Sequence, residues 1–158
     1  MGGKLNCIDR ERVSIMRTYT VSQAKRLVPL LQRELSKLRP AYSELKQLWL
    51  EAAEEKGLAV EDPEVRDLCL QDDRAKRAIE QVENSLSLFD DLGVECKAIE
   101  EGVFDFPCLV EDRIVFLCWQ AGENDVSHWH ELDTGYGGRR PLQELTLAPN
   151  SQRETFIN

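Results

Sequence analysis

Apolar side chains recur at steps of four and three residues through the first third of the chain, which is the spacing of one face of an α-helix. The recurring positions are Ala24, Val28, Leu31, Leu35, Leu38, Tyr42, Leu45 and Trp49. Thr20 and Gln23 have the spacing of a capping box, so we expect a helix to begin there and to end at Gly57. Pro29 and Pro40 lie inside the stripe, and because proline lacks an amide hydrogen, we expect bends or a break near them.

A second stripe of the same period follows a short linker. Asp62 and Pro63 provide an N-cap with proline at the first helical position. Asp72 interrupts the stripe, and Gly93 ends it. The apolar positions are Val65, Leu68, Ala75, Ile79, Val82, Leu86 and Phe89. Two helices of similar length joined by a short turn predict an antiparallel hairpin whose apolar seams face inward.

The apolar period then changes to two, as expected for β-strands. Residues 103–110 and 113–120 are predicted to pair as a hairpin with Glu111 and Asp112 in the turn. This register gives one apolar face, made of Phe104, Phe106, Cys108, Val115, Leu117 and Trp119.

The other face of the hairpin is more polar. Asp105 is expected opposite Cys118 there, whereas Cys108 and Cys118 point to opposite faces, which argues against a disulfide between them. Pro107 cannot donate to a ladder, so its strand is predicted to be an edge or to carry a bulge.

These elements predict an α+β fold, a long antiparallel helical hairpin packed on a small antiparallel β-sheet. The segments GVECKAIE and VSHWHEL can add short strands. We expect a flexible leader over 1–18, one domain over 19–148 and a flexible tail over 149–158. Within the domain, 19–93 is the helical hairpin and 94–148 the β-rich part.

Composition narrows the possible partners. A chain of 158 residues with a net charge of -9 is repelled on average by nucleic acid and by anionic membranes, so we expect neither as a partner. The first 15 residues lack the apolar middle of a secretory signal, which favours a cytoplasmic protein. The 5 cysteines are odd in number and scattered, which predicts free thiols.

The segment SHWHELDTGYGGRR, residues 127–140, carries both histidines of the chain and most of its candidate chemistry. Together with LGVE, DFP and LCW before it, this segment resembles the bacterial and plastid family catalogued as domain of unknown function 2203. The resemblance runs from about Tyr19 to Leu142. The matching positions are Asp105, Trp119, Trp129, His130, Glu131, Asp133, Gly135, Gly138, Arg139 and Pro141. It implies an architecture and a region of interest, but the activity of that family is not established.

A metal site is one hypothesis for this segment. On an extended strand His128 and His130 project from the same face, and Asp133 or Asp105 can add a carboxylate. Such a set suits zinc or iron. The sequence calls for no other cofactor. In the alternative, His130 hydrogen-bonds within a polar turn and His128 is exposed.

An anion site is a second hypothesis. The glycine-rich backbone can turn its amides toward a phosphate or carboxylate, which an arginine can clamp. The candidates are Trp129, Glu131, Gly135, Gly138, Arg139 and Arg140. In the purely structural alternative, Arg139 pairs with Glu131 or Asp133 and pins the turn.

For the function, the sequence leaves two hypotheses. The first is a small cytoplasmic module that binds a protein partner or dimerises through its helices, because their apolar seams are longer than so small a sheet can cover. The second is a metal- or anion-binding, enzyme-like domain centred on residues 127–140. Whether the chain is an enzyme stays open.

Overall fold

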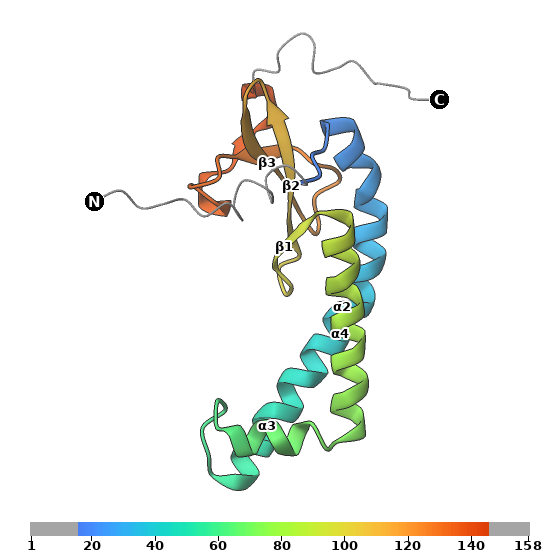
Figure 1. The fold of residues 1–158 in the computed structure, drawn as a ribbon, viewed down its shortest axis with the longest axis vertical. Coiled ribbons are helices and arrows are strands. Elements are labelled where there is room, and N and C mark those ends of the chain that lie inside the picture. Colours follow the sequence, from blue (N-terminus) through green and yellow to red (C-terminus); the bar gives the residue numbers. More distant parts are fainter. Residues whose placement is uncertain (1–15, 146–158) are drawn as a thin grey trace, which may run out of the picture.

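The computed structural model describes residues 16–145. Three α-helices come first and five strands follow (Figure 1). The helices are α2 (Val21–Lys56), α3 (Pro63–Cys69) and α4 (Asp73–Leu92). The strands are β1 (Glu95–Ala98), β2 (Val103–Val110), β3 (Arg113–Gln120), β4 (His128–His130) and β5 (Arg140–Pro141). The α+β prediction is confirmed, whereas most of the predicted leader and all of the predicted tail lie outside the described residues.

Helix α2 begins and ends where the sequence predicts. The Thr20 side chain accepts from the Gln23 amide, the Gln23 side chain accepts from the Thr20 amide, and Gly57 closes the helix in the left-handed conformation, with φ 65°. Pro29 and Pro40 do not break the helix. Figure 1 shows α2 changing direction about midway, so a bend accommodates the prolines.

The second predicted helix is in fact two helices, so the prediction of one continuous element was wrong. The Asp72 side chain accepts from the amides of Arg74 and Ala75 and starts α4 as a new N-cap. Asp62 caps α3, with Pro63 in its first turn, as expected. Asp72 was predicted to be an interruption within one helix, but it is the N-cap that begins a new helix.

The helices cover most of their own apolar seams. Figure 1 shows α2 and α4 side by side, with α3 at the end away from the sheet. There Leu48, Cys69 and Ala75 form a small separate core. We call the part of the helices around this core, residues 45–75, the arm. Its exposed large apolar side chains are Leu50, Val60 and Leu70.

The sheet has five strands in the order β1-β2-β3-β4-β5, with antiparallel neighbours. The predicted hairpin register is confirmed, because Val110 pairs with Arg113 and Asp105 pairs with Cys118. Glu111 takes the left-handed conformation that the tight turn requires, with φ 54°.

Pro107 does not mark an edge strand, since β2 lies between β1 and β3. The pairing of β1 with β2 reaches only from Val103 to Asp105, and the irregularity in that ladder lies in β1. Past the end of β1, the Pro107 carbonyl accepts from the Tyr19 amide at 2.7 Å. The missing amide hydrogen therefore falls on a stretch of β2 that β1 does not pair.

One face of the sheet, the apolar face, packs on α2 and α4. Phe104 stacks on Trp119 at 5.9 Å between ring centroids and meets the edge of Phe89 of α4 at 4.9 Å. Phe106, Cys108, Val115 and Leu117 belong to the same core. The four cysteines in the described residues, Cys69, Cys96, Cys108 and Cys118, are free thiols. No helix of the described residues is long and apolar enough to cross a membrane.

Candidate functional site

The opposite face of the sheet, the polar face, carries the candidate site. Asp105 of β2, Cys118 of β3 and His128 of β4 occupy one row across three adjacent strands. His130 lies two residues further along β4, on the same side as His128, because side chains alternate along a strand. The expectation that both imidazoles share a face agrees with this register.

Asp105, Cys118 and His130 form a buried trio. One ligand atom from each lies within 4.8 Å of the others. Their exposed fractions are 2%, 0% and 1% respectively. Asp105 and His130 are thus, with Ser85, the buried polar residues of the part of the chain that the structure describes.

The hydrogen bonds of His130 determine what can lie between it and Asp105. Its Nδ1 is 2.8 Å from the backbone carbonyl oxygen of Glu131, and a carbonyl only accepts, so Nδ1 carries a hydrogen. In a neutral imidazole Nε2 then bears a lone pair, yet it faces the Asp105 Oδ2 at 3.1 Å. Two acceptors at this distance require a cation between them, either a proton or a metal ion.

Asp105 is incompletely satisfied, and its carboxylate lies beside the Cys118 thiol. Oδ1 of Asp105 is buried and has no hydrogen-bond partner among the described residues. Burial raises the pKa of the Cys118 thiol to about 12, and the nearby Asp105 carboxylate adds to the shift. The thiol is therefore protonated at neutral pH and is a poor nucleophile in the absence of a metal.

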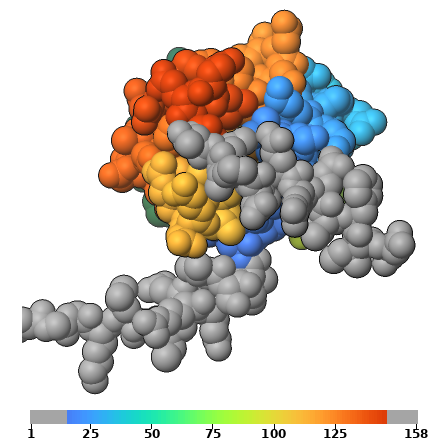
Figure 2. Space-filling view, turned by 90° about the horizontal axis from the view of Figure 1, so that it is seen from above, coloured from blue at the N-terminus to red at the C-terminus, as the bar shows by residue number. Residues whose placement is uncertain are grey.

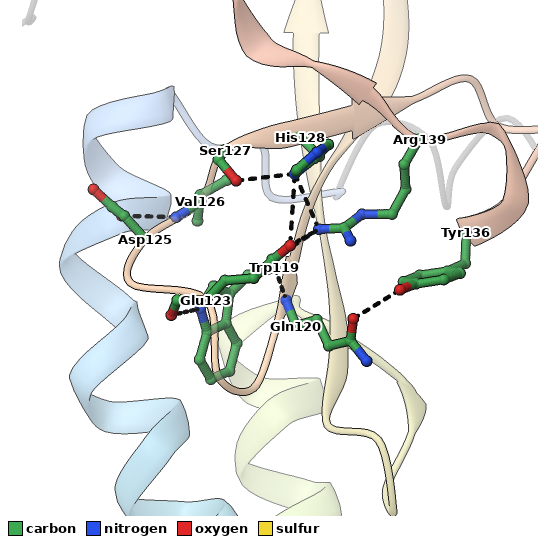
Figure 3. A network of polar contacts seen from close by, with 9 residues as sticks. All are labelled: Trp119, Gln120, Glu123, Asp125, Val126, Ser127, His128, Tyr136 and Arg139. Atoms are coloured by element: carbon green, nitrogen blue, oxygen red, sulfur yellow. Dashed lines mark hydrogen bonds and ion pairs between the residues drawn. The ribbon is translucent and has the colours of Figure 1, made fainter.

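A partly exposed polar network adjoins the trio (Figure 3). Nη2 of Arg139 is 2.7 Å from both carboxylate oxygens of Glu123 and 3.3 Å from Nδ1 of His128. The turn after β3 positions Glu123, because its side chain accepts from the Gln120 amide at 2.8 Å. Tyr136 donates to the Gln120 side chain at 2.7 Å.

Residues 134–139, the glycine-rich segment, bring Tyr136 and Arg139 onto the polar face. Gly135 has φ 58°. A side chain at Gly138 would lie 2.3 Å from the Thr134 Cβ, so the backbone turns too tightly there for any larger residue. Figure 2 views this end of the molecule, with the orange-to-red C-terminal part at one side and the start of α2, in blue, at the other.

Of the predicted metal ligands, the structure brings Asp105 and His130 together. His128 shares their face but contacts Ser127, Glu123 and Arg139 instead. Asp133 is exposed and makes no hydrogen bond or ion pair with the described residues.

The predicted anion-site residues point to different partners. Glu131 pairs with Arg113, and Arg140 pairs with Glu144 at 2.9 Å. The Trp129 ring belongs to the core, with the Arg140 guanidinium 4.8 Å from its centroid. The prediction that Arg139 meets Glu131 or Asp133 was wrong, because its carboxylate partner is Glu123.

Sequence reasoning left two residues out of the candidate set. Cys118 was expected opposite Asp105, but only the pairing of β3 with β4 places it beside His130 as well. Glu123 lies in a turn after β3, where nothing in the pattern distinguishes it from the other acidic residues of the chain.

Comparison with known proteins gives one match. Residues 17–142 match the sequence model of a family described as "Uncharacterized conserved protein (DUF2203)". Neither the curated proteins nor the solved structures contain a match.

Proposed function

Since the chain belongs to the DUF2203 family of uncharacterized conserved proteins, whose description names no activity, we propose a function from the site itself: the chain binds a zinc ion through Asp105, Cys118 and His130. The observation that carries this proposal is the facing pair of acceptors, Nε2 of His130 and Oδ2 of Asp105, inside a site that also holds a thiol.

The geometry and chemistry of the trio suit zinc. Ligand atoms about 2.0 to 2.1 Å from a tetrahedral zinc ion are about 3.3 Å apart, close to the 3.1 Å between the two acceptors. The bond from Nδ1 of His130 to a backbone carbonyl is the outer-shell contact that fixes a ligating imidazole. Thiolate and imidazole together favour zinc over magnesium or calcium.

A proton between His130 and Asp105 is the competing explanation. Wherever that proton lies, on His130 or on Asp105, Oδ1 of Asp105 is left buried without a hydrogen-bond partner among the described residues, which costs free energy. A metal ion beside Cys118 uses the same orphaned carboxylate and the thiol, so the zinc proposal accounts for all three side chains.

The role that follows is structural or regulatory rather than openly catalytic. The three ligands come from β2, β3 and β4, so one ion ties three strands together. All three ligands are buried from solvent, whereas catalytic zinc keeps a position that water or substrate can reach. We place this role in the cytoplasm, where thiols stay reduced and Cys118 is free to bind.

Metal titration of the full chain tests the proposal. The reduced protein, dialysed against a chelator, is titrated with Zn²⁺, and with Co²⁺ as a spectroscopic probe whose thiolate charge-transfer band reports Cys118. We expect one ion per chain, and loss of that binding in His130→Gln and Cys118→Ser. Asp133→Asn is the matched control, because Asp133 lies in the same region but outside the trio.

Two results contradict the proposal. One is a wild-type chain that binds neither ion while its melting curve shows that it is folded. The other is a folded Cys118→Ser variant whose cobalt spectrum and affinity equal those of the wild type.

A second candidate function concerns the arm. Leu50, Val60 and Leu70 are exposed there, away from the sheet, and such side chains can contact a protein partner or a second copy of the chain (Figure 1). Most of the seam that motivated this hypothesis is covered within the chain. A native mass measured against concentration tests dimerisation.

A further inference from the structure

A zinc ion held by three protein groups needs a fourth ligand. We infer that His128 supplies it, and that the Glu123–Arg139 ion pair competes with the metal for this side chain, so that zinc binding and the position of the glycine-rich segment are coupled. This inference rests on the proposed zinc site. It adds the fourth ligand of that site and a contact that regulates zinc binding.

The strand register places His128 close enough to Cys118 to reach the proposed zinc ion. His128 is paired directly with Cys118, and the Cβ atoms of such cross-strand neighbours lie about 4.5 to 5.5 Å apart. It shares its side of β4 with His130. About a third of its side chain is exposed, 34%, so its ring is not locked in the core.

The contacts of Nδ1 decide whether His128 can bind a metal. Nδ1 lies 2.9 Å from the Ser127 hydroxyl, 3.3 Å from Nη2 of Arg139 and 3.6 Å from Oε1 of Glu123. A guanidinium only donates, so its bond makes Nδ1 an acceptor and puts the ring hydrogen on Nε2. In that tautomer Nε2 cannot ligate a metal.

Moving the hydrogen to Nδ1 makes the ring a ligand. Nδ1–H can then donate to the Ser127 hydroxyl or to the Glu123 carboxylate, and Nε2 is left with a lone pair. His130 has the same arrangement, because its Nδ1 donates to the Glu131 carbonyl while its Nε2 faces the Asp105 carboxylate. A carboxylate that holds a ligating imidazole is a recurring outer-shell feature of zinc sites.

Arg139 links the tautomer of His128 to the position of the glycine-rich segment. Its guanidinium packs 4.9 Å from the Tyr136 ring centroid and is bound to Glu123 through Nη2. Its Nε is buried and has no partner among the described residues, so the guanidinium is not held by a full set of acceptors. When His128 turns to the metal, Arg139 loses a contact and the segment that carries it is less constrained.

The test compares Zn²⁺ and Co²⁺ affinities of the full-length reduced chain and of four variants. We expect His128→Ala to weaken binding by about 100-fold or more, beyond what loss of most outer-shell partners costs. Arg139→Gln removes the competing donor and should tighten binding by up to about 10-fold. Arg140→Gln removes the same charge from the neighbouring position, whose partner is Glu144, and should change the affinity less. His130→Gln is the reference for loss of the site.

The outcomes separate the two proposals. If His130→Gln abolishes binding while a folded His128→Ala variant keeps the wild-type affinity and cobalt spectrum, the zinc site stands and the fourth-ligand inference is wrong. If Arg139→Gln binds no more tightly than Arg140→Gln, the competition is wrong. If the folded wild type binds neither ion, the proposed function fails and the inference fails with it.

Discussion

The two faces of the same sheet are buried for different reasons. On the apolar face, Phe104, Phe106 and Trp119 are fully buried against the helices, and burial itself stabilises the fold. On the polar face, Asp105 and His130 are buried almost as completely. There burial costs free energy, because it removes ionisable groups from water.

The difference between the two faces is the reason for the proposed zinc site. A fold does not require a carboxylate, a thiol and an imidazole in one dry cluster, since apolar side chains of similar volume are often as stable or more so. Oδ1 of Asp105 is a buried acceptor without a hydrogen-bond donor among the described residues, and the proposed ion would satisfy it. Substitutions on the two faces should therefore respond differently to zinc.

The largest expected effect is on the apolar face. Phe106→Ala should lower the free energy of unfolding by about 3 to 5 kcal/mol, because it leaves a cavity at the centre of the core. The loss should be the same with and without zinc, as measured by urea denaturation. A loss that depended strongly on zinc would remove the distinction between the faces.

The polar face should give the opposite pattern. Saturating Zn²⁺ at about 100 times its dissociation constant should raise the unfolding free energy of the wild type by about 2.7 kcal/mol. Cys118→Ala removes only the sulfur and should leave stability without zinc within about 1.5 kcal/mol of the wild type, while the gain from zinc disappears. A gain retained by this variant would mean that Cys118 is not a ligand.

The sequence predicts those features of the two faces that depend on residues close together in the chain. Strict alternation and a two-residue turn determine the hairpin register, so both the apolar face and the pairing of Asp105 with Cys118 were predictable. The α2 caps were predictable too, since Thr20, Gln23 and Gly57 act on backbone groups close to them.

Two of the three wrong or missed predictions depend on contacts between residues far apart in the sequence, whereas the one at Asp72 is local. The break at Asp72 was missed because the apolar stripe continues across it, although its side chain satisfies two amides of a new helix. The partner of Arg139 was missed because Glu123 reaches it only after β4 and the glycine-rich segment fold back over the polar face. Cys118 joined the site only once β4 was paired with β3.

Each face of the sheet buries a thiol, so the stability contributed by both faces should depend on pH. Burial raises the pKa of Cys108 to about 11 and that of Cys118 to about 12, from an ordinary value of 9.0. Below pH 9 both the folded and the unfolded chain keep these protons. Above it the unfolded chain ionises first, so stability falls as the pH rises toward the folded pKa values.

Each thiol should contribute a slope of about 1.4 kcal/mol per pH unit in that range. Cys108→Ala and Cys118→Ala should each reduce the slope, and the contribution of Cys118 should persist to a higher pH. Unfolding followed at fixed pH values from 8 upward, in the absence of zinc, measures both. If the slope were unchanged in Cys118→Ala, the thiol on the polar face would not be held protonated by its surroundings.

The smallest effect is expected where neither face is involved. Leu50 and Leu70 are on the arm and are 55% and 46% exposed, so Leu50→Ser and Leu70→Ser should change the unfolding free energy by no more than about 0.5 kcal/mol. Neither change should alter zinc affinity, because the arm has its own core. If the wild type is a dimer by native mass and the double variant is a monomer, the arm is an interface and its apolar side chains serve binding rather than folding. If both proteins have the same mass and stability, dimerisation through these side chains is ruled out, and the polar face remains the part of the molecule whose burial the fold alone does not explain.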